Sequence, residues 1–160
     1  MKLFVNEYKY TTDIISESMA AWWGRRFRKG YISMGICILL ILGVFFLTMK
    51  LPYLLLELLP ILMIVLFKAK EKQAVKQEAE RMEVIYNDII PSIRVEISED
   101  IHVSSDKNDN RISFSDVENV VESKNLIILL VKGSMTVPLD KKGFISGNAD
   151  ECMKYLKERI

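Results

Sequence analysis

Few side chains in this sequence have the types and spacing that chemistry requires. The chain has a single histidine, His102, on the polar side of an alternating segment, and no second histidine or suitable cysteine to complete a metal site. No glycine-rich loop precedes a helix, so no phosphate-binding loop is indicated. Enzymes need positioned bases, nucleophiles or ligands, and we therefore expect no catalytic, cofactor or metal site. We interpret His102 as a surface residue.

One ionisable side chain is notable for its surroundings. Glu57 lies inside an apolar run, where a charge costs about 2.5–3.5 kcal/mol on insertion scales. One interpretation places it, as a protonated acid, against the glycine face of the preceding run near Gly43 or against another copy of the chain. The other places it among the outer headgroups with Lys50.

Two apolar runs form the surroundings of Glu57. Residues 31–49 carry no charged side chain, and residues 51–67 follow after Lys50. Each run is close to the length that crosses about 30 Å of hydrocarbon at 1.5 Å per residue. Pro52 disfavours helix for the residue before it, so the sequence predicts a tight transmembrane hairpin. The first run starts too far along the chain, and is too long, for a signal peptide.

Basic residues predict how the hairpin is oriented. Four precede the first run and three (Lys68, Lys70 and Lys72) follow the second, against Lys50 alone in the turn. Lys and Arg concentrate in cytosolic flanks, so we expect a multi-pass protein of the cell membrane with both termini cytosolic. Tryptophans beside the first cluster are typical of a membrane boundary. The predicted interface anchors are Trp22, Trp23, Arg25, Arg26, Arg28 and Lys29.

The segments that flank the hairpin favour regular structure. In the N-terminal part, residues 1–30, residues 3–9 read as a strand and residues 13–23 as a helix that begins at Thr12 or Asp13. That helix either lies in the membrane interface or packs on the soluble domain. Residues 68–90 predict a helical linker with one narrow apolar stripe, either packed on its own domain or paired in a dimeric coiled coil.

From residue 91 to residue 160 the apolar residues alternate with polar ones, which predicts five or six short antiparallel strands. A helix follows, with Asn148 as N-cap and Glu151 three residues later. The predicted fold class is α+β: a transmembrane hairpin followed by a β meander or barrel that an amphipathic C-terminal helix closes. This is the layout of pleckstrin-homology-like domains.

Short motifs in residues 91–160 resemble the YcxB-like family, small bacterial membrane proteins with a pleckstrin-homology-like C-terminal domain. The resemblance rests on Ile112-Ser-Phe-Ser-Asp-Val117, on the apolar stretch Leu126 to Val131, on Val137-Pro-Leu-Asp-Lys-Lys-Gly-Phe144 and on the terminal helix. Phe114 stands where the family more often has tryptophan, and Asp140 where a lysine is usual. The resemblance implies a fold and a membrane location and assigns no active or binding site.

The motif residues Phe114, Asp116, Pro138 and Phe144 read as structural. Asp116 suits a cap for the turn after residues 111–114. Pro138 indicates a strand end or an edge strand, and Phe144 an anchor for the loop before the last helix.

Charge narrows the choice of partners. Residues 88–160 carry 10 Lys/Arg and 13 Asp/Glu, which disfavours nucleic acid and, on average, anionic headgroups. We therefore expect a membrane-anchored interaction or scaffold module whose partners are the lipid bilayer and a cytosolic protein or a second copy. The alternative is a small membrane-active oligomer, transporter-like or stress-related, assembled through the hairpin around Glu57.

Overall fold

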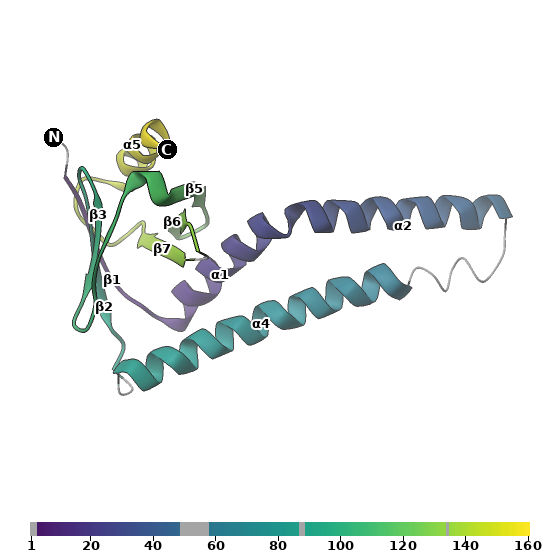
Figure 1. Ribbon diagram of the computed structural model, residues 1–160, viewed down its shortest axis with the longest axis horizontal. Coiled ribbons are helices and arrows are strands. Elements are labelled where there is room, and N and C mark those ends of the chain that lie inside the picture. The colour runs from purple at the N-terminus through teal and green to yellow at the C-terminus, as the bar shows by residue number, and fades with distance from the viewer. Residues whose placement is uncertain (1–2, 49–57, 87–88, 134) are drawn as a thin grey trace.

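The computed structural model describes residues 3–48, 58–86, 89–133 and 135–160. A mixed domain lies at one end of the molecule, and two long helices extend away from it side by side (Figure 1). The helices are α1 (Thr12–Arg26), α2 (Arg28–Thr48), α4 (Leu58–Tyr86) and α5 (Ala149–Arg159). The strands are β1 (Phe4–Lys9), β2 (Ser92–Ile97), β3 (Ile101–Ser105), β4 (Asp109–Ile112), β5 (Val117–Glu122), β6 (Leu126–Val131), β7 (Met135–Asp140) and β8 (Phe144–Ser146).

The strands form two antiparallel sheets. One sheet has five strands in the order β4-β3-β2-β1-β8, and the other has three in the order β5-β6-β7. The α+β class is therefore confirmed, but the described strands do not close into a barrel. The physical reason is that the ladder stops between β4 and β5, where a 3₁₀ turn at Phe114–Asp116 leads the chain from one sheet to the other.

β1 connects the two ends of the sequence. It pairs with β2 along its whole length, from Phe4 opposite Ile97 to Lys9 opposite Ser92, and on its other edge with the short strand β8. The five-stranded sheet is thus not a product of residues 91–160 alone. The strand β8 itself was not predicted, because three residues are too few to show alternation.

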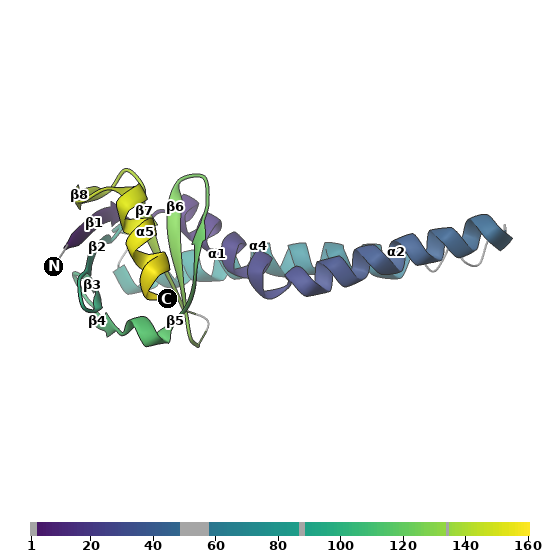
Figure 2. The same ribbon diagram turned by 90° about the horizontal axis from the view of Figure 1, so that it is seen from above.

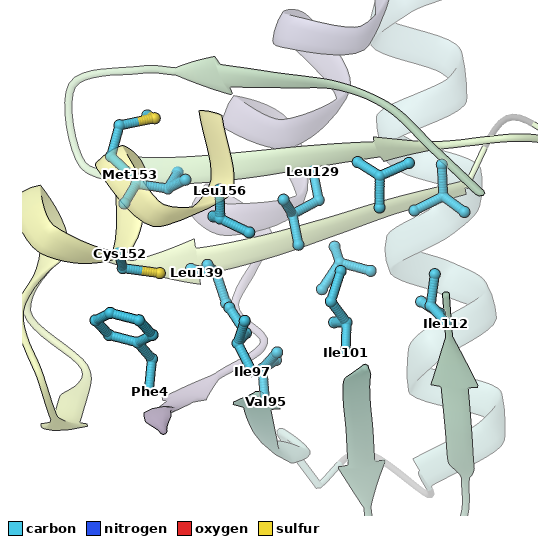
Figure 3. Close-up of a cluster of buried hydrophobic side chains, with 14 of the residues drawn as sticks. Phe4, Val95, Ile97, Ile101, Ile112, Leu129, Leu139, Cys152, Met153 and Leu156 are labelled. Atoms are coloured by element: carbon cyan, nitrogen blue, oxygen red, sulfur yellow. The ribbon is translucent and has the colours of Figure 1, made fainter. Parts of the chain in front are cut away.

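The main core lies between the sheets and under α5. Phe4, Val95, Ile97 and Ile101 project from the larger sheet toward Leu129 of the smaller one (Figure 3). The helix α5 adds Cys152, Met153 and Leu156 and lies across one side of the two sheets (Figures 2 and 3). Its N-cap is Asn148, whose side chain accepts a hydrogen bond of 2.8 Å from the Glu151 N–H.

A second, smaller core explains why β6 is apolar throughout. Its outward residues Leu126, Ile128 and Leu130 are buried and pack against Ile14 and Trp22 of α1. With both faces covered, the strand has no solvent side on which a polar residue would be favourable. Of the two interpretations for the first helix, the structure therefore shows packing on the domain. The helix begins after Thr11, one residue earlier than predicted.

A buried amide joins the two sheets. Asn6 of β1 is fully buried, and its Nδ2 donates to the main-chain carbonyl of Asp140 at 2.7 Å. The Asp140 N–H donates in return to Oδ1 of Asn6 at 3.0 Å. The Asn6 side chain thus takes the place of a paired strand along this part of β7.

Candidate functional site

The helix α2 is the most apolar element of the chain. Its most apolar window has a mean hydropathy of 2.5, and none of that window is buried inside the protein. Among the described residues it is the one helix long and apolar enough to cross a membrane. Residues 58–67 of the second predicted span form the first part of α4, and residues 51–57 lie outside the described residues.

An aromatic cluster holds α4 against the joint between α1 and α2. Phe27 stands at this joint, and its ring lies 4.7 Å from that of Trp23 and 5.1 Å from that of Phe67 on α4. Tyr31 approaches the same Phe67 ring at 6.0 Å. We call Trp23, Phe27, Tyr31 and Phe67 the aromatic cluster. It brings residues about 40 positions apart into one layer, as an aromatic belt at a membrane boundary would require.

The predicted interface anchors divide between two environments. Arg25, Arg26, Arg28 and Lys29 are exposed around the aromatic cluster, and the Arg26 guanidinium lies 5.4 Å from the centre of the Trp22 ring. Trp22 itself packs on the outer face of β6. The sequence predicts the same role for both tryptophans, but in the structure Trp23 belongs to the aromatic cluster and Trp22 packs on the domain.

Glu57 lies outside the described residues, so its placement stays a prediction. The partner suggested for it, Gly43, is described: a Cβ added there would meet no atom within 4 Å, and the same holds at Gly35. The described part of α4 therefore does not approach the glycine face of α2. The close helix approach that these glycines predicted within the hairpin is absent from the described residues.

The motif residues make contacts with α5 and with the sheets. Phe114 packs edge-on to Tyr155 of α5 at 6.2 Å, with the Arg159 guanidinium over both rings. Pro138 lies on β7, an edge strand. Phe144 begins β8 and packs on the main core.

The cap after β4 differs from the prediction. Ser113, rather than Asp116, caps the 3₁₀ turn by accepting a hydrogen bond from the Ser115 N–H at 3.3 Å. The Asp116 carboxylate instead lies 3.7 Å from Nζ of Lys132 in the β6–β7 turn. The reason is position: Ser113 directly precedes the first turn of this helix, where an Oγ can reach the free N–H groups.

The groups that could do chemistry are dispersed. His102 pairs with the carboxylate of Asp109 across neighbouring strands. Burial raises the pKa of the Cys152 thiol to about 12, so it is inert, and Cys37 is exposed on α2. No cluster of metal-ligating side chains occurs among the described residues.

Three exposed branched side chains lie within seven sequence positions of one another where α4 ends. Val84 is 80% exposed, Ile89 69% and Ile90 55%. We call them the distal patch. A cleft of about 380 Å³ opens beside it, between α4 and the start of α1, and is lined by Tyr10, Thr11, Thr12, Asp13, Ile15, Ala79, Met82, Ile89, Ile90 and Pro91. The narrow apolar stripe predicted for residues 68–90 consists of Val75, Ala79, Met82, Tyr86 and Ile89, and three of these (Ala79, Met82 and Ile89) line the cleft. Val84, the most exposed residue of the distal patch, does not belong to the stripe.

The same part of α4 also packs against the domain. Tyr86 is buried, and its hydroxyl lies 2.9 Å from Oγ of Ser105 on β3. The Lys107 ammonium stands 5.5 Å from the centre of the Tyr86 ring. The linker helix is therefore packed on its own domain, which was one of its two interpretations.

Comparison with known proteins gives one result. Residues 98–156 match the family model described as YcxB-like protein, which confirms the resemblance predicted from the motifs. The match runs from just after β2 into α5 and leaves out β1, α1 and the long helices. Neither curated proteins nor solved structures gave a match.

Proposed function

We propose that this chain, whose residues 98–156 match the YcxB-like family model, is a membrane-anchored module that presents its mixed domain to a cytosolic protein. Residues 31–49 and 51–67 form the transmembrane hairpin in this proposal, and both termini are cytosolic. The exposed apolar surface of α2 supports the membrane location, since water would solvate it poorly. The finer fold proposal is a pleckstrin-homology-like arrangement, supported by two facing sheets with α5 across one open side.

The distal patch is the observation that carries an interaction role. Clustered exposed apolar side chains on a soluble surface mark a contact site more often than scattered ones do. From Phe67 in the aromatic cluster to Val84 is about 25 Å along α4 at 1.5 Å per residue, which places the patch well clear of the bilayer. A partner there would reach α4 directly, and α4 leads into the membrane.

The test is cross-linking inside the cell from single positions. A photoreactive amino acid replaces Ile90 in the full chain, and in a control chain it replaces Ile145 on β8, which is 64% exposed and lies outside the patch. We expect a discrete cross-linked product from position 90 only, and expect Val84→Glu to abolish it. Equal products from both positions, or none from position 90, would overturn the interaction role. A product at twice the chain mass of 18.5 kDa would identify a second copy as the partner.

Topology is tested separately. A reporter enzyme that is active only outside the membrane, fused after Ile160, should stay silent, whereas the same reporter inserted at Lys50 should be active. Activity at Ile160 would overturn the proposed orientation.

A further inference from the structure

A small cavity lies where α1 meets the three-stranded sheet, next to the proposed membrane boundary. Its volume is about 290 Å³, and it is lined by Trp22, Arg25, Arg26, Glu118, Leu130, Val131 and Gly133. Arg26 directly precedes Phe27 of the aromatic cluster, so this cavity opens at the level where α1 passes into α2. Figure 1 shows that α1 approaches this joint along the smaller sheet.

Three charges line the cavity without neutralising one another. Within the part of the chain that the structure describes, Arg25, Arg26 and Glu118 form no ion pair and no side-chain hydrogen bond, although both signs of charge face the same space. Arg26 is held by its stacking on Trp22, which fixes a guanidinium without consuming its donors. A ligand that carries both signs of charge would complement all three groups.

The backbone of β5 is irregular at the carboxylate. Val117 pairs with Val131 and Asn119 pairs with Leu130, so Glu118 is an extra residue in the ladder. Such a bulge bends the strand and redirects a side chain, and bulges are frequent beside functional sites. Regular pairing would place residue 118 opposite Leu130; the bulge instead leaves Glu118 unpaired at the rim of the cavity.

We propose that this cavity binds the phosphoethanolamine headgroup of a membrane lipid, with the phosphate on Arg25 and Arg26 and the ammonium on Glu118. Arginine donors suit phosphate oxygens, and a carboxylate accepts hydrogen bonds from a primary ammonium but not from the quaternary group of choline. The apolar atoms of Trp22, Leu130 and Val131 would contact the glycerol end. The inference rests on the proposed membrane location.

The test measures which lipid the intact protein retains. The full chain is reconstituted in bilayers with equal amounts of phosphatidylethanolamine and phosphatidylcholine, extracted in mild detergent, and its bound lipid is identified by native mass spectrometry. We expect the ethanolamine lipid to be enriched about two- to fivefold, the range that one partly exposed charge pair gives. Glu118→Gln should remove this preference. Arg25→Gln with Arg26→Gln should lower retention of both lipids.

Matched controls separate the site from charge in general. Glu99→Gln changes an exposed carboxylate in the β2–β3 turn, and Arg111→Gln an exposed guanidinium on β4. Neither should alter lipid retention. Equal retention of both lipids by the parent, or an unchanged preference in Glu118→Gln, would overturn the site. Retention of free phosphoethanolamine in preference to the lipid, when both are supplied at equal concentration, would overturn the lipid as the source of the headgroup.

Alkaline carbonate washing of native membranes keeps this inference separate from the proposed function. Protein that is washed off would overturn the membrane location and this site together. Protein that stays in the membrane and retains no ethanolamine lipid would overturn the site alone.

Discussion

Replacing Asn6 by leucine removes the amide that joins the two sheets. The loss in the free energy of unfolding depends on which hydrogen bonds the Asp140 main chain keeps after this substitution. Lys141 donates its N–H to the Asn125 carbonyl across the β6–β7 ladder, and hydrogen-bonded pairs alternate along an antiparallel ladder. Residues 138 and 140 therefore turn their main-chain nitrogens away from β6. Pro138 has no N–H to satisfy there, whereas Asp140 depends on Asn6.

Only one of the two groups on Asp140 is left without a partner in Asn6→Leu. The carbonyl keeps a hydrogen bond of 2.9 Å from the Gly143 N–H, but the Asp140 N–H loses its acceptor. An unsatisfied, partly buried donor costs about 1–3 kcal/mol. Leucine keeps the branching of the asparagine side chain at Cγ but is bulkier, so overpacking at this fully buried position adds to the loss and leaves no cavity.

The assay is urea unfolding of the full chain in detergent micelles, followed by tryptophan fluorescence. Trp22 packs on β6 and reports the loss of the domain. The control is Asn110→Leu, since Asn110 is exposed on β4 and its side chain makes no hydrogen bond within the described residues; its effect should stay within about 0.5 kcal/mol. If Asn6→Leu unfolds no earlier in urea than Asn110→Leu, the amide does not hold the sheets together and the reasoning fails.

Three further predictions concern α1, two glycines and β1. Burial acts to raise the pKa of Glu17, but hydrogen bonds from Ser123, Asn125 and Leu126 outweigh it and hold that pKa below the ordinary 4.5. The stabilising contribution of the ionised Glu17 is therefore complete above pH 4.5 and is lost as the pH falls through the lowered folded-state pKa. The urea midpoints of the parent and of Glu17→Gln should differ at neutral pH and converge in acid. A difference between the two midpoints that does not change with pH would contradict this prediction. Gly133→Ala should lower the free energy of unfolding by about 1–2 kcal/mol because the φ of Gly133 is +80°. Gly147 has a similar φ of +76°, but a Cβ there would also stand 2.4 Å from the Phe4 ring, so Gly147→Ala should cost about 1–3 kcal/mol more in the same urea assay. Equal losses in the two variants would contradict the predicted clash. A fragment of residues 89–160 should lack stable sheet structure by circular dichroism and gain it when a peptide of residues 3–12 is added, and a fragment that folds unaided would show that β1 is dispensable.

Local patterns predicted the local structure well. The alternation of Ile93, Val95 and Ile97 predicted the strand that becomes β2, and the spacing of Asn148 and Glu151 predicted the start of α5. These signals depend on neighbours within a few residues, and sequence carries them directly.

The long-range arrangement was not predictable from those signals. The alternation in residues 4–9 indicates a strand, but nothing in it specifies a partner some 90 residues later, or shows that Asn6 is buried. The continuous apolar run of β6 left open what covers its second face, which proves to be α1. Glu118 reaches the cavity from a bulge, which changes register without leaving a clear sequence signal.

The place of β1 inside its sheet, between β2 and β8, has a consequence for biosynthesis. A ribosome makes β1 first, yet its second neighbour, β8, begins only at Phe144. At 5–20 residues per second, translation of the intervening chain takes about 7–27 s. During that interval both long helices emerge, while the first strand has an unsatisfied edge. The nascent chain therefore has to keep its N-terminal segment from pairing with other strands until the last part of the domain has left the ribosome.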